Sequence, residues 1–111
     1  MQLSRPPPPP DSQLPLTGIR VLDLCDLRGP SCGRILADLG AEVILVEPPE
    51  GMLSRLRAPV VDSQSLYFAT HNANKFSVQL DLESQEGKKD FLKLVRNSDM
   101  LIDGGDKSIW E

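Results

Sequence analysis

Histidine, cysteine and aromatic residues are all scarce in this sequence. Aromatic residues make up 5% of its 111 residues, which leaves little with which to stack nucleic-acid bases. The single histidine, His71, excludes a metal site built from several imidazoles, and we expect no metal site. Two cysteines, Cys25 and Cys32, are too few for a disulfide scaffold, so we expect both to be reduced.

Basic charge and long apolar runs are lacking as well. Twelve Lys and Arg residues stand against sixteen Asp and Glu residues, giving a net charge of -4. A general nucleic-acid binder needs the opposite balance, so we expect no nucleic-acid partner. No apolar run is long enough to span a bilayer and the N-terminus has no signal core, so we expect no membrane and take the cytoplasm as the default location.

What is present is enough for one domain behind a proline-rich tail. Hydrophobic residues make up 40% of the chain, which suits one modest core. Residues 1–15 include five consecutive prolines, residues 6–10, and should be disordered or form polyproline II. We expect the ordered domain to cover residues 16–111.

Hydrophobic spacing predicts alternating strands and helices. The predicted strands are residues 19–24, 42–46, 77–82 and 100–102, and the predicted helices are residues 30–39 and 85–97. Pro30 suits a first helical turn, Gly40 suits a helix end, and Ser84 suits an N-cap. Residues 50–64 should be a loop, and residues 65–69 fit a short helix or a strand. The order predicts an α/β fold with a mostly parallel sheet.

Candidate ligand-binding segments follow the predicted strands, at residues 25–33, 47–51, 81–84 and 103–106. Glu47 stands where a dinucleotide-binding fold places its ribose carboxylate. However, the chain has no G-x-G-x-x-G motif, which favours an exposed strand-end carboxylate. Cys32 should be a small buried residue on a helix, with His71 in a loop, which disfavours a catalytic Cys–His pair. The turn from Asn72 to Lys75 either holds a phosphate or carbonyl or is simply a capped turn.

Several motifs in consistent order resemble class III CoA-transferases, the CaiB/BaiF-like family of formyl-CoA and carnitine CoA-transferases. They lie between Pro15 and Asp103, at residues 15–24, 29–32, 36–44, 46–51, 66–68, 72–78, 80–82 and 86–87. The resemblance implies the N-terminal part of a large Rossmann-like domain. α-Methylacyl-CoA racemase is similar over the same region and stays an alternative.

The resemblance also implies a substrate and a site. Family members are intertwined dimers that move coenzyme A between carboxylic acids, using an aspartate as acyl carrier. That aspartate would lie downstream of Asp103, so we expect no catalytic residue in this chain and no activity from it alone. Mitochondria and peroxisomes also house family members. The implied CoA contacts are Leu27, Arg28, Leu80, Asp81, Leu82, Glu83, Gly104 and Gly105.

Departures from the family pattern suggest further readings. The family's Asn-Arg-Asn-Lys-Arg turn has Ala73 and Phe76 in place of its two arginines, and the loop before Gly29 is one residue shorter. Each arginine would contribute about 1.5–3 kcal/mol if it touched a phosphate. A non-catalytic remnant that pairs with and regulates a full-length relative is therefore a second hypothesis. A dinucleotide-binding module using Glu47 is a third.

Overall fold

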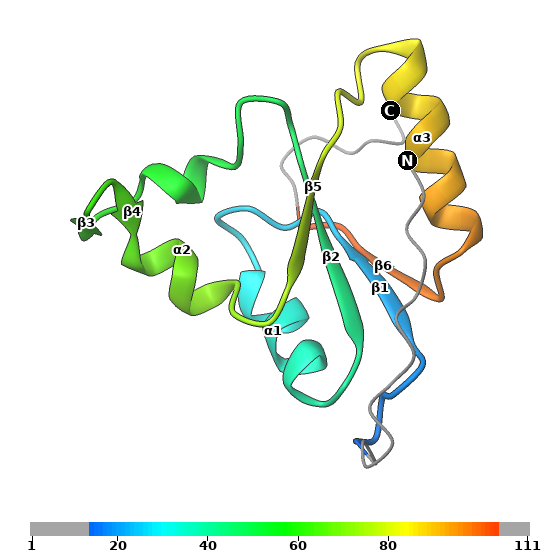
Figure 1. The fold of residues 1–111 in the computed structure, drawn as a ribbon, viewed down its shortest axis with the longest axis horizontal. Coiled ribbons are helices and arrows are strands. Elements are labelled where there is room, and N and C mark those ends of the chain that lie inside the picture. Colours follow the sequence, from blue (N-terminus) through cyan, green and yellow to red (C-terminus); the bar gives the residue numbers. More distant parts are fainter. Residues whose placement is uncertain (1–13, 105–111) are drawn as a thin grey trace.

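The computed structural model describes residues 14–104, and these form a parallel sheet with helices on both faces (Figure 1). The four strands are β1 (Arg20–Asp23), β2 (Glu42–Glu47), β5 (Phe76–Gln79) and β6 (Met100–Ile102), in the order β5-β2-β1-β6. Every neighbouring pair is parallel. The predicted α/β fold is therefore confirmed. Most of the predicted tail, residues 1–13, and the last residues, 105–111, lie outside the described part.

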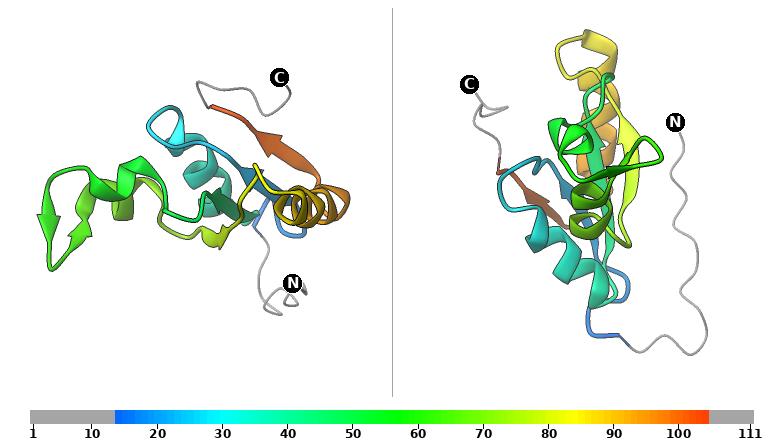
Figure 2. Two further views of the ribbon diagram at one scale, coloured as in Figure 1. Left: turned by 90° about the horizontal axis from the view of Figure 1, so that it is seen from above. Right: turned by 90° about the vertical axis from the view of Figure 1, so that its left-hand side faces the viewer.

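The register gives the two faces of the sheet different partners. Leu22 is level with Ile44, and the side chains of both pack against α3 (Gln85–Arg96). The neighbouring residues Val21 and Val43 face the other way and pack near α1 (Pro30–Asp38). The two helices therefore cover opposite faces of the sheet (Figure 2).

Helix ends follow the signals in the sequence. Pro30 opens α1, where its missing N–H costs nothing, and Gly40 follows its end with φ of 104°. The Ser84 side chain caps α3 by accepting a hydrogen bond from the Gly87 amide at 2.9 Å. The four basic residues of α3 are all exposed: Lys88, Lys89, Lys93 and Arg96.

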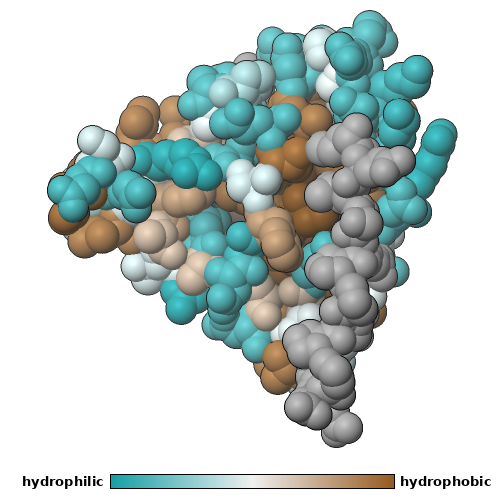
Figure 3. Space-filling view, in the orientation of Figure 1, coloured by the Kyte–Doolittle hydropathy of each residue, from teal (hydrophilic) through white to brown (hydrophobic). Residues whose placement is uncertain are grey.

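The predicted loop at residues 50–64 is more ordered than its sequence indicates. It contains a 3-10 helix, η1 (Leu53–Leu56), and a two-stranded antiparallel hairpin of β3 (Val60–Val61) and β4 (Gln64–Ser65). Helix α2 (Leu66–His71) follows, so the segment that fitted either a helix or a strand is helical. We call residues 53–71 the arm, because they extend away from the sheet in Figure 1. Figure 3 shows hydrophobic residues gathered at its far end, where Leu56, Val60 and Val61 are exposed.

Strand β5 is shorter than predicted. Apolar and polar residues alternate as far as Leu82, but the strand ends at Gln79. The Leu80 amide still donates to the Glu47 carbonyl at 2.9 Å, and the chain then turns, with the Ser84 amide bonded to the Asp81 carbonyl. Alternation continues past the strand because Leu80 and Leu82 both belong to the core beneath α3.

Candidate functional site

The carboxyl ends of the parallel strands carry the predicted CoA contacts. In the loop after β1, Leu27 and Arg28 are both exposed. Gly104, just after β6, lies against this loop. A Cβ atom added to Gly104 would be 2.6 Å from the Arg28 carbonyl oxygen and 3.0 Å from Cys25 Sγ. The fold thus places Leu27, Arg28 and Gly104 together, whereas Gly105 lies outside the described residues.

The third predicted segment, residues 80–83, lies at the other side of the sheet. It follows β5, which β1 and β2 separate from β6. Leu80 is buried and Leu82 packs against the core, so their side chains stabilise the fold. Asp81 and Glu83 are exposed, and an Asp81 carboxylate oxygen accepts a hydrogen bond from the Glu83 amide at 3.0 Å. Only the polar residues of this segment present their side chains to solvent.

A buried ion pair lies beneath the loop after β1. Lys75 Nζ is 2.7 Å from Asp23 Oδ2, and the two side chains are 1% and 0% exposed. Lys75 Nζ also donates to the Pro30 carbonyl at 2.9 Å and to Asn72 Oδ1 at 2.8 Å. The turn containing Asn72 and Lys75 is visible in the sequence, but its contact with Asp23 is not. The sequence left open whether this turn holds a phosphate or carbonyl of a ligand or is simply a capped turn. These bonds support a structural role for the turn.

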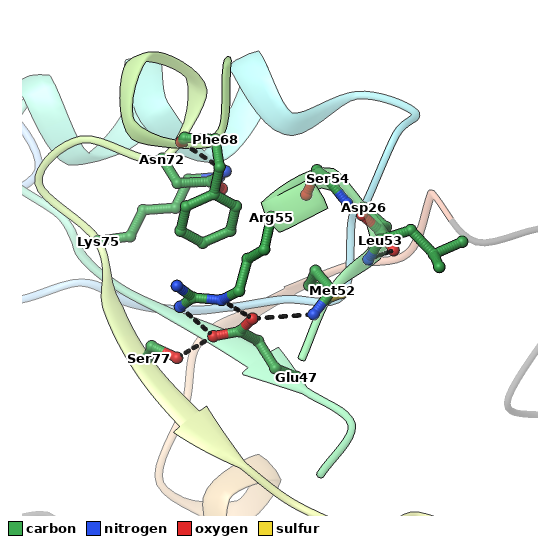
Figure 4. Close-up of polar contacts among 10 residues, drawn as sticks. All are labelled: Asp26, Glu47, Met52, Leu53, Ser54, Arg55, Phe68, Asn72, Lys75 and Ser77. Atoms are coloured by element: carbon green, nitrogen blue, oxygen red, sulfur yellow. Dashed lines mark hydrogen bonds and ion pairs between the residues drawn. The ribbon is translucent and has the colours of Figure 1, made fainter. Parts of the chain in front are cut away.

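Glu47 is buried in a second polar cluster, so the expectation of an exposed carboxylate is wrong. Arg55 donates from Nε at 2.6 Å and from Nη2 at 2.7 Å, the Met52 amide donates at 3.1 Å, and Ser77 Oγ also donates (Figure 4). The Arg55 guanidinium also lies 4.0 Å from the centre of the Phe68 ring, which belongs to the arm. The cluster therefore joins the end of β2 to the arm.

These contacts keep Glu47 ionised. Burial on its own would raise the pKa of Glu47, but hydrogen bonds from Arg55, Ser77 and Met52 lower the pKa to about 2. The same pairing raises the pKa of Arg55. Because both carboxylate oxygens accept bonds from within the protein, Glu47 serves here as a structural anion.

Asp26 is a polar residue whose role the sequence did not reveal. Its carboxylate accepts hydrogen bonds from the amides of Leu53 at 2.8 Å and Ser54 at 2.9 Å. It therefore holds the first turn of η1 against the loop after β1. Asp26 and η1 are 27 residues apart or more, so no local pattern predicts the contact.

Of the two free cysteines, Cys32 differs from expectation in its burial. Cys32 is on α1, as expected, but it is exposed, because the buried positions of that helix are Pro30 and Gly33. Cys25 is buried, and burial together with the charge of Asp23 raises its pKa to about 12. A thiol held protonated in this way is a poor nucleophile.

His71 is the last residue of α2 and not part of a loop. Its Nδ1 lies 2.8 Å from the Tyr67 carbonyl, and its ring lies 4.1 Å from the Tyr67 ring. These contacts pair the His71 ring with Tyr67 of the same helix. Within residues 14–104, no three His, Cys, Asp or Glu side chains gather as they would around a metal ion. None of the helices in that range is long and apolar enough to cross a membrane.

Comparison with known proteins relates the chain to a family. The sequence profile of CoA-transferase family III matches residues 16–111. Formyl-CoA:oxalate CoA-transferase of Streptomyces coelicolor is 43% identical over 91 residues, and that of Escherichia coli is 41% identical over 92. These matches cover 79% and 80% of this chain and 22% of each relative. The chain therefore spans about a fifth of the length of these relatives.

Solved structures give the same result. A crystal structure of Rv3272 from Mycobacterium tuberculosis is 40% identical with a TM-score of 0.73, and the match covers 80% of this chain and 25% of that one. A CaiB/BaiF family protein from Brucella suis is 38% identical with a TM-score of 0.72, covering 78% and 25%. From its sequence and its fold, this chain belongs to CoA-transferase family III.

Proposed function

We propose that this chain supplies part of the CoA-binding edge of an enzyme that moves coenzyme A between carboxylic acids. The observation that carries the proposal is the close approach of Gly104 to the Arg28 carbonyl, in a member of CoA-transferase family III. This approach puts the exposed Arg28 at the carboxyl end of a parallel sheet, where ligands of such folds bind.

The chemistry of this edge suits a nucleotide phosphate. A guanidinium can form charge-assisted, bidentate hydrogen bonds with a phosphate, and the start of α1 adds a favourable partial positive charge. Gly29, with φ of 72°, ends the loop that carries Arg28 and leads directly into α1. We expect Leu27 to contact the apolar part of CoA or its base, and Gly104 and Gly105 to allow its close approach.

The donor and acceptor acids belong to the proposal as well. The named relatives use formyl-CoA and oxalate, so we propose an acyl-CoA donor and a small carboxylic acid as acceptor. The acyl-carrying aspartate and the dimer partner that the resemblance implies would both act together with this segment. A racemase acting on 2-methylacyl-CoA is the alternative chemistry.

The first experiment is to find the native polypeptide that carries residues 76–88. Mass spectrometry of size-separated extract should place this peptide in a protein several times longer than 111 residues. That protein, once purified, should transfer CoA from formyl-CoA to oxalate. Racemisation without transfer would contradict the proposal, and a peptide found only at the size of this chain would favour the regulatory remnant.

A variant then tests the role of Arg28 in that protein. Arg28→Ala should raise KM for the CoA substrate about 10- to 100-fold, because it removes a charge-assisted contact. Arg96→Ala is the matched control, since Arg96 is an exposed arginine near the end of α3, on a helix that packs on the other side of the sheet from α1. Equal KM values for the two variants would show that Arg28 does not contact the CoA substrate.

A further inference from the structure

One buried ion pair holds both ends of the loop after β1. At the start of the loop, Asp23 Oδ1 accepts a hydrogen bond from the Cys25 amide at 2.8 Å. At its end, Lys75 Nζ donates to the Pro30 carbonyl at 2.9 Å. Asp23 Oδ2 and Lys75 Nζ are themselves 2.7 Å apart. We call this pair the Asp23–Lys75 clamp, because its two charges join residue 25 to residue 30.

Helix α1 leaves room for the clamp only because residue 33 is a glycine. A Cβ atom there would lie 2.2 Å from Asp23 Oδ2 and 3.0 Å from Lys75 Cε. The carboxylate therefore lies directly against the helix backbone. The resulting contact fixes α1 relative to β1, and therefore fixes the position of the first turn of α1, where the loop ends.

Lys75 comes to the clamp from a distant part of the chain. It directly precedes β5, and Phe76 is level with Ile44 and hence with Leu22 of β1. The start of β5 is therefore level with the end of β1, with β2 between them, and the long Lys75 side chain reaches across to Asp23 beneath the loop. Asn72 Oδ1, 2.8 Å from Lys75 Nζ, holds the ammonium from the side of α2.

The middle of the loop is anchored once more, and its tip is exposed. Asp26 binds the amides of Leu53 and Ser54, which fixes the loop against η1. Leu27 and Arg28, between this anchor and Pro30, are both exposed. The anchored residues thus surround the two side chains that the proposed function assigns to CoA.

We propose that the Asp23–Lys75 clamp is a positioning device for CoA: it holds residues 24–29 in the conformation that presents Leu27 and Arg28 to the nucleotide. Lys75 and Asp23 act through the loop and touch no ligand themselves, since both side chains are buried. The CoA part of this inference rests on the proposed function, whereas the clamping of the loop stands on the contacts alone.

The test compares two ion pairs of the same chain. Lys75→Met removes the clamp's positive charge and keeps a long side chain. Glu42→Gln is the matched control, because it breaks the Arg20–Glu42 pair (2.8 Å) at the opposite end of β1 and β2. Amide hydrogen exchange is read for residues 25–29 and, as a reference, for residues 43–45 of β2. CoA dissociation constants are measured by calorimetry on the same samples.

The clamp predicts a selective change. In Lys75→Met, exchange of residues 25–29 should accelerate at least tenfold beyond any change in residues 43–45, and the CoA dissociation constant should rise at least tenfold. Glu42→Gln should change neither quantity in this way. Uniform acceleration, or none, would overturn the clamp, and a loosened loop with unchanged CoA affinity would overturn its positioning role.

Two further provisions distinguish a failure of the clamp from a failure of the proposed function and from a variant that does not fold. If the unaltered full-length protein that carries this chain does not bind CoA, the proposed function fails, and the exchange pattern alone decides whether the clamp exists. If Lys75→Met does not fold, Asn72→Ala replaces it, because it removes one partner of the ammonium and leaves the ion pair in place. That variant should accelerate exchange in residues 25–29 by a smaller factor, and an unchanged loop would contradict the proposal.

Discussion

Two buried carboxylates, Asp23 and Glu47, lie on the same side of the sheet, and each is paired with a cation from another segment. Asp23 pairs with Lys75 and Glu47 with Arg55. Burying a charge is costly unless it is paired and hydrogen-bonded, and removing one partner of such a pair costs about 3–5 kcal/mol. These pairs therefore fix the turn before β5 and the arm against the sheet.

The Glu47 cluster predicts a pH dependence of stability. The pKa of Glu47 is lowered from 4.5 to about 2 in the folded chain, so its contribution is fully present above pH 4.5 and is lost as the pH falls towards 2. Glu47→Gln should reduce the free energy of unfolding at pH 7 by roughly 3 kcal/mol, and the difference from the unaltered chain should shrink towards pH 2. Urea unfolding at several pH values checks this.

The control for this measurement is Glu83→Gln, which removes an exposed carboxylate. Its stability should stay within about 0.5 kcal/mol of that of the unaltered chain at every pH. A difference for Glu47→Gln that does not vary with pH would mean that the Arg55 contact stabilises through packing alone.

The two thiols should react differently. Cys32 is exposed, while Cys25 is buried with its pKa raised to about 12, so an alkylating reagent at pH 8 should modify Cys32 and leave Cys25 intact. Mass spectrometry of peptides before and after unfolding in urea measures both sites. The variants Cys25→Ser and Cys32→Ser assign each signal to its cysteine. Rapid labelling of Cys25 in the folded chain would contradict its burial and its raised pKa.

At the scale of the elements, α3 depends on its first turn. The Ser84 side chain caps the helix, and Gly87 lets the helix approach the Asp81 carbonyl, which a Cβ atom would meet at 1.8 Å. Ser84→Ala should reduce the free energy of unfolding by about 1 kcal/mol. Ser84→Asp should keep most of this stabilisation, because aspartate can also cap a helix. Chemical denaturation measures both, and an unchanged stability of Ser84→Ala would show that the cap contributes nothing.

Much of the sheet and both long helices could be predicted from the sequence, because their signals are local. The buried run before Pro48, the capping Ser84 and the Gly40 that follows α1 each act within a few residues. The β3–β4 hairpin could not be predicted, since its turn residues Asp62 and Ser63 both have positive φ (51° and 62°), a conformation that Asn-Gly or Asp-Gly usually signals. Residues 50–64 carry no such signal.

The candidate site was predictable only in its position. Parallel strands bring their carboxyl ends to one edge, which is why the loop with Arg28 and the turn with Gly104 were both expected at that edge. The partners of Asp23, Asp26 and Glu47 were not predictable. Lys75, η1 and Arg55 reach them through tertiary contacts that depend on the register of β5 and on the path of the arm.

At the scale of the whole molecule, the arm exposes apolar surface. The exposed fractions of Leu53, Leu56, Val60 and Val61 are 66%, 80%, 52% and 53%, and neighbouring patches of this kind favour association. The double variant Leu56→Lys, Val61→Lys should reduce self-association of the chain in sedimentation velocity and change the free energy of unfolding by less than about 1 kcal/mol. An unchanged sedimentation distribution would place association elsewhere, for example at the edges of the sheet.

CoA binding by the edge that carries Arg28 is the central claim, and an NMR titration of the labelled chain tests it most directly. Adding CoA should shift the amide signals of residues 25–29 and of Asp103 and Gly104, with smaller shifts at residues 80–84. NAD at the same concentration should shift them less. Shifts confined to residues 47–51, a preference for NAD, or no shifts at millimolar CoA would contradict a CoA site at this edge of the sheet.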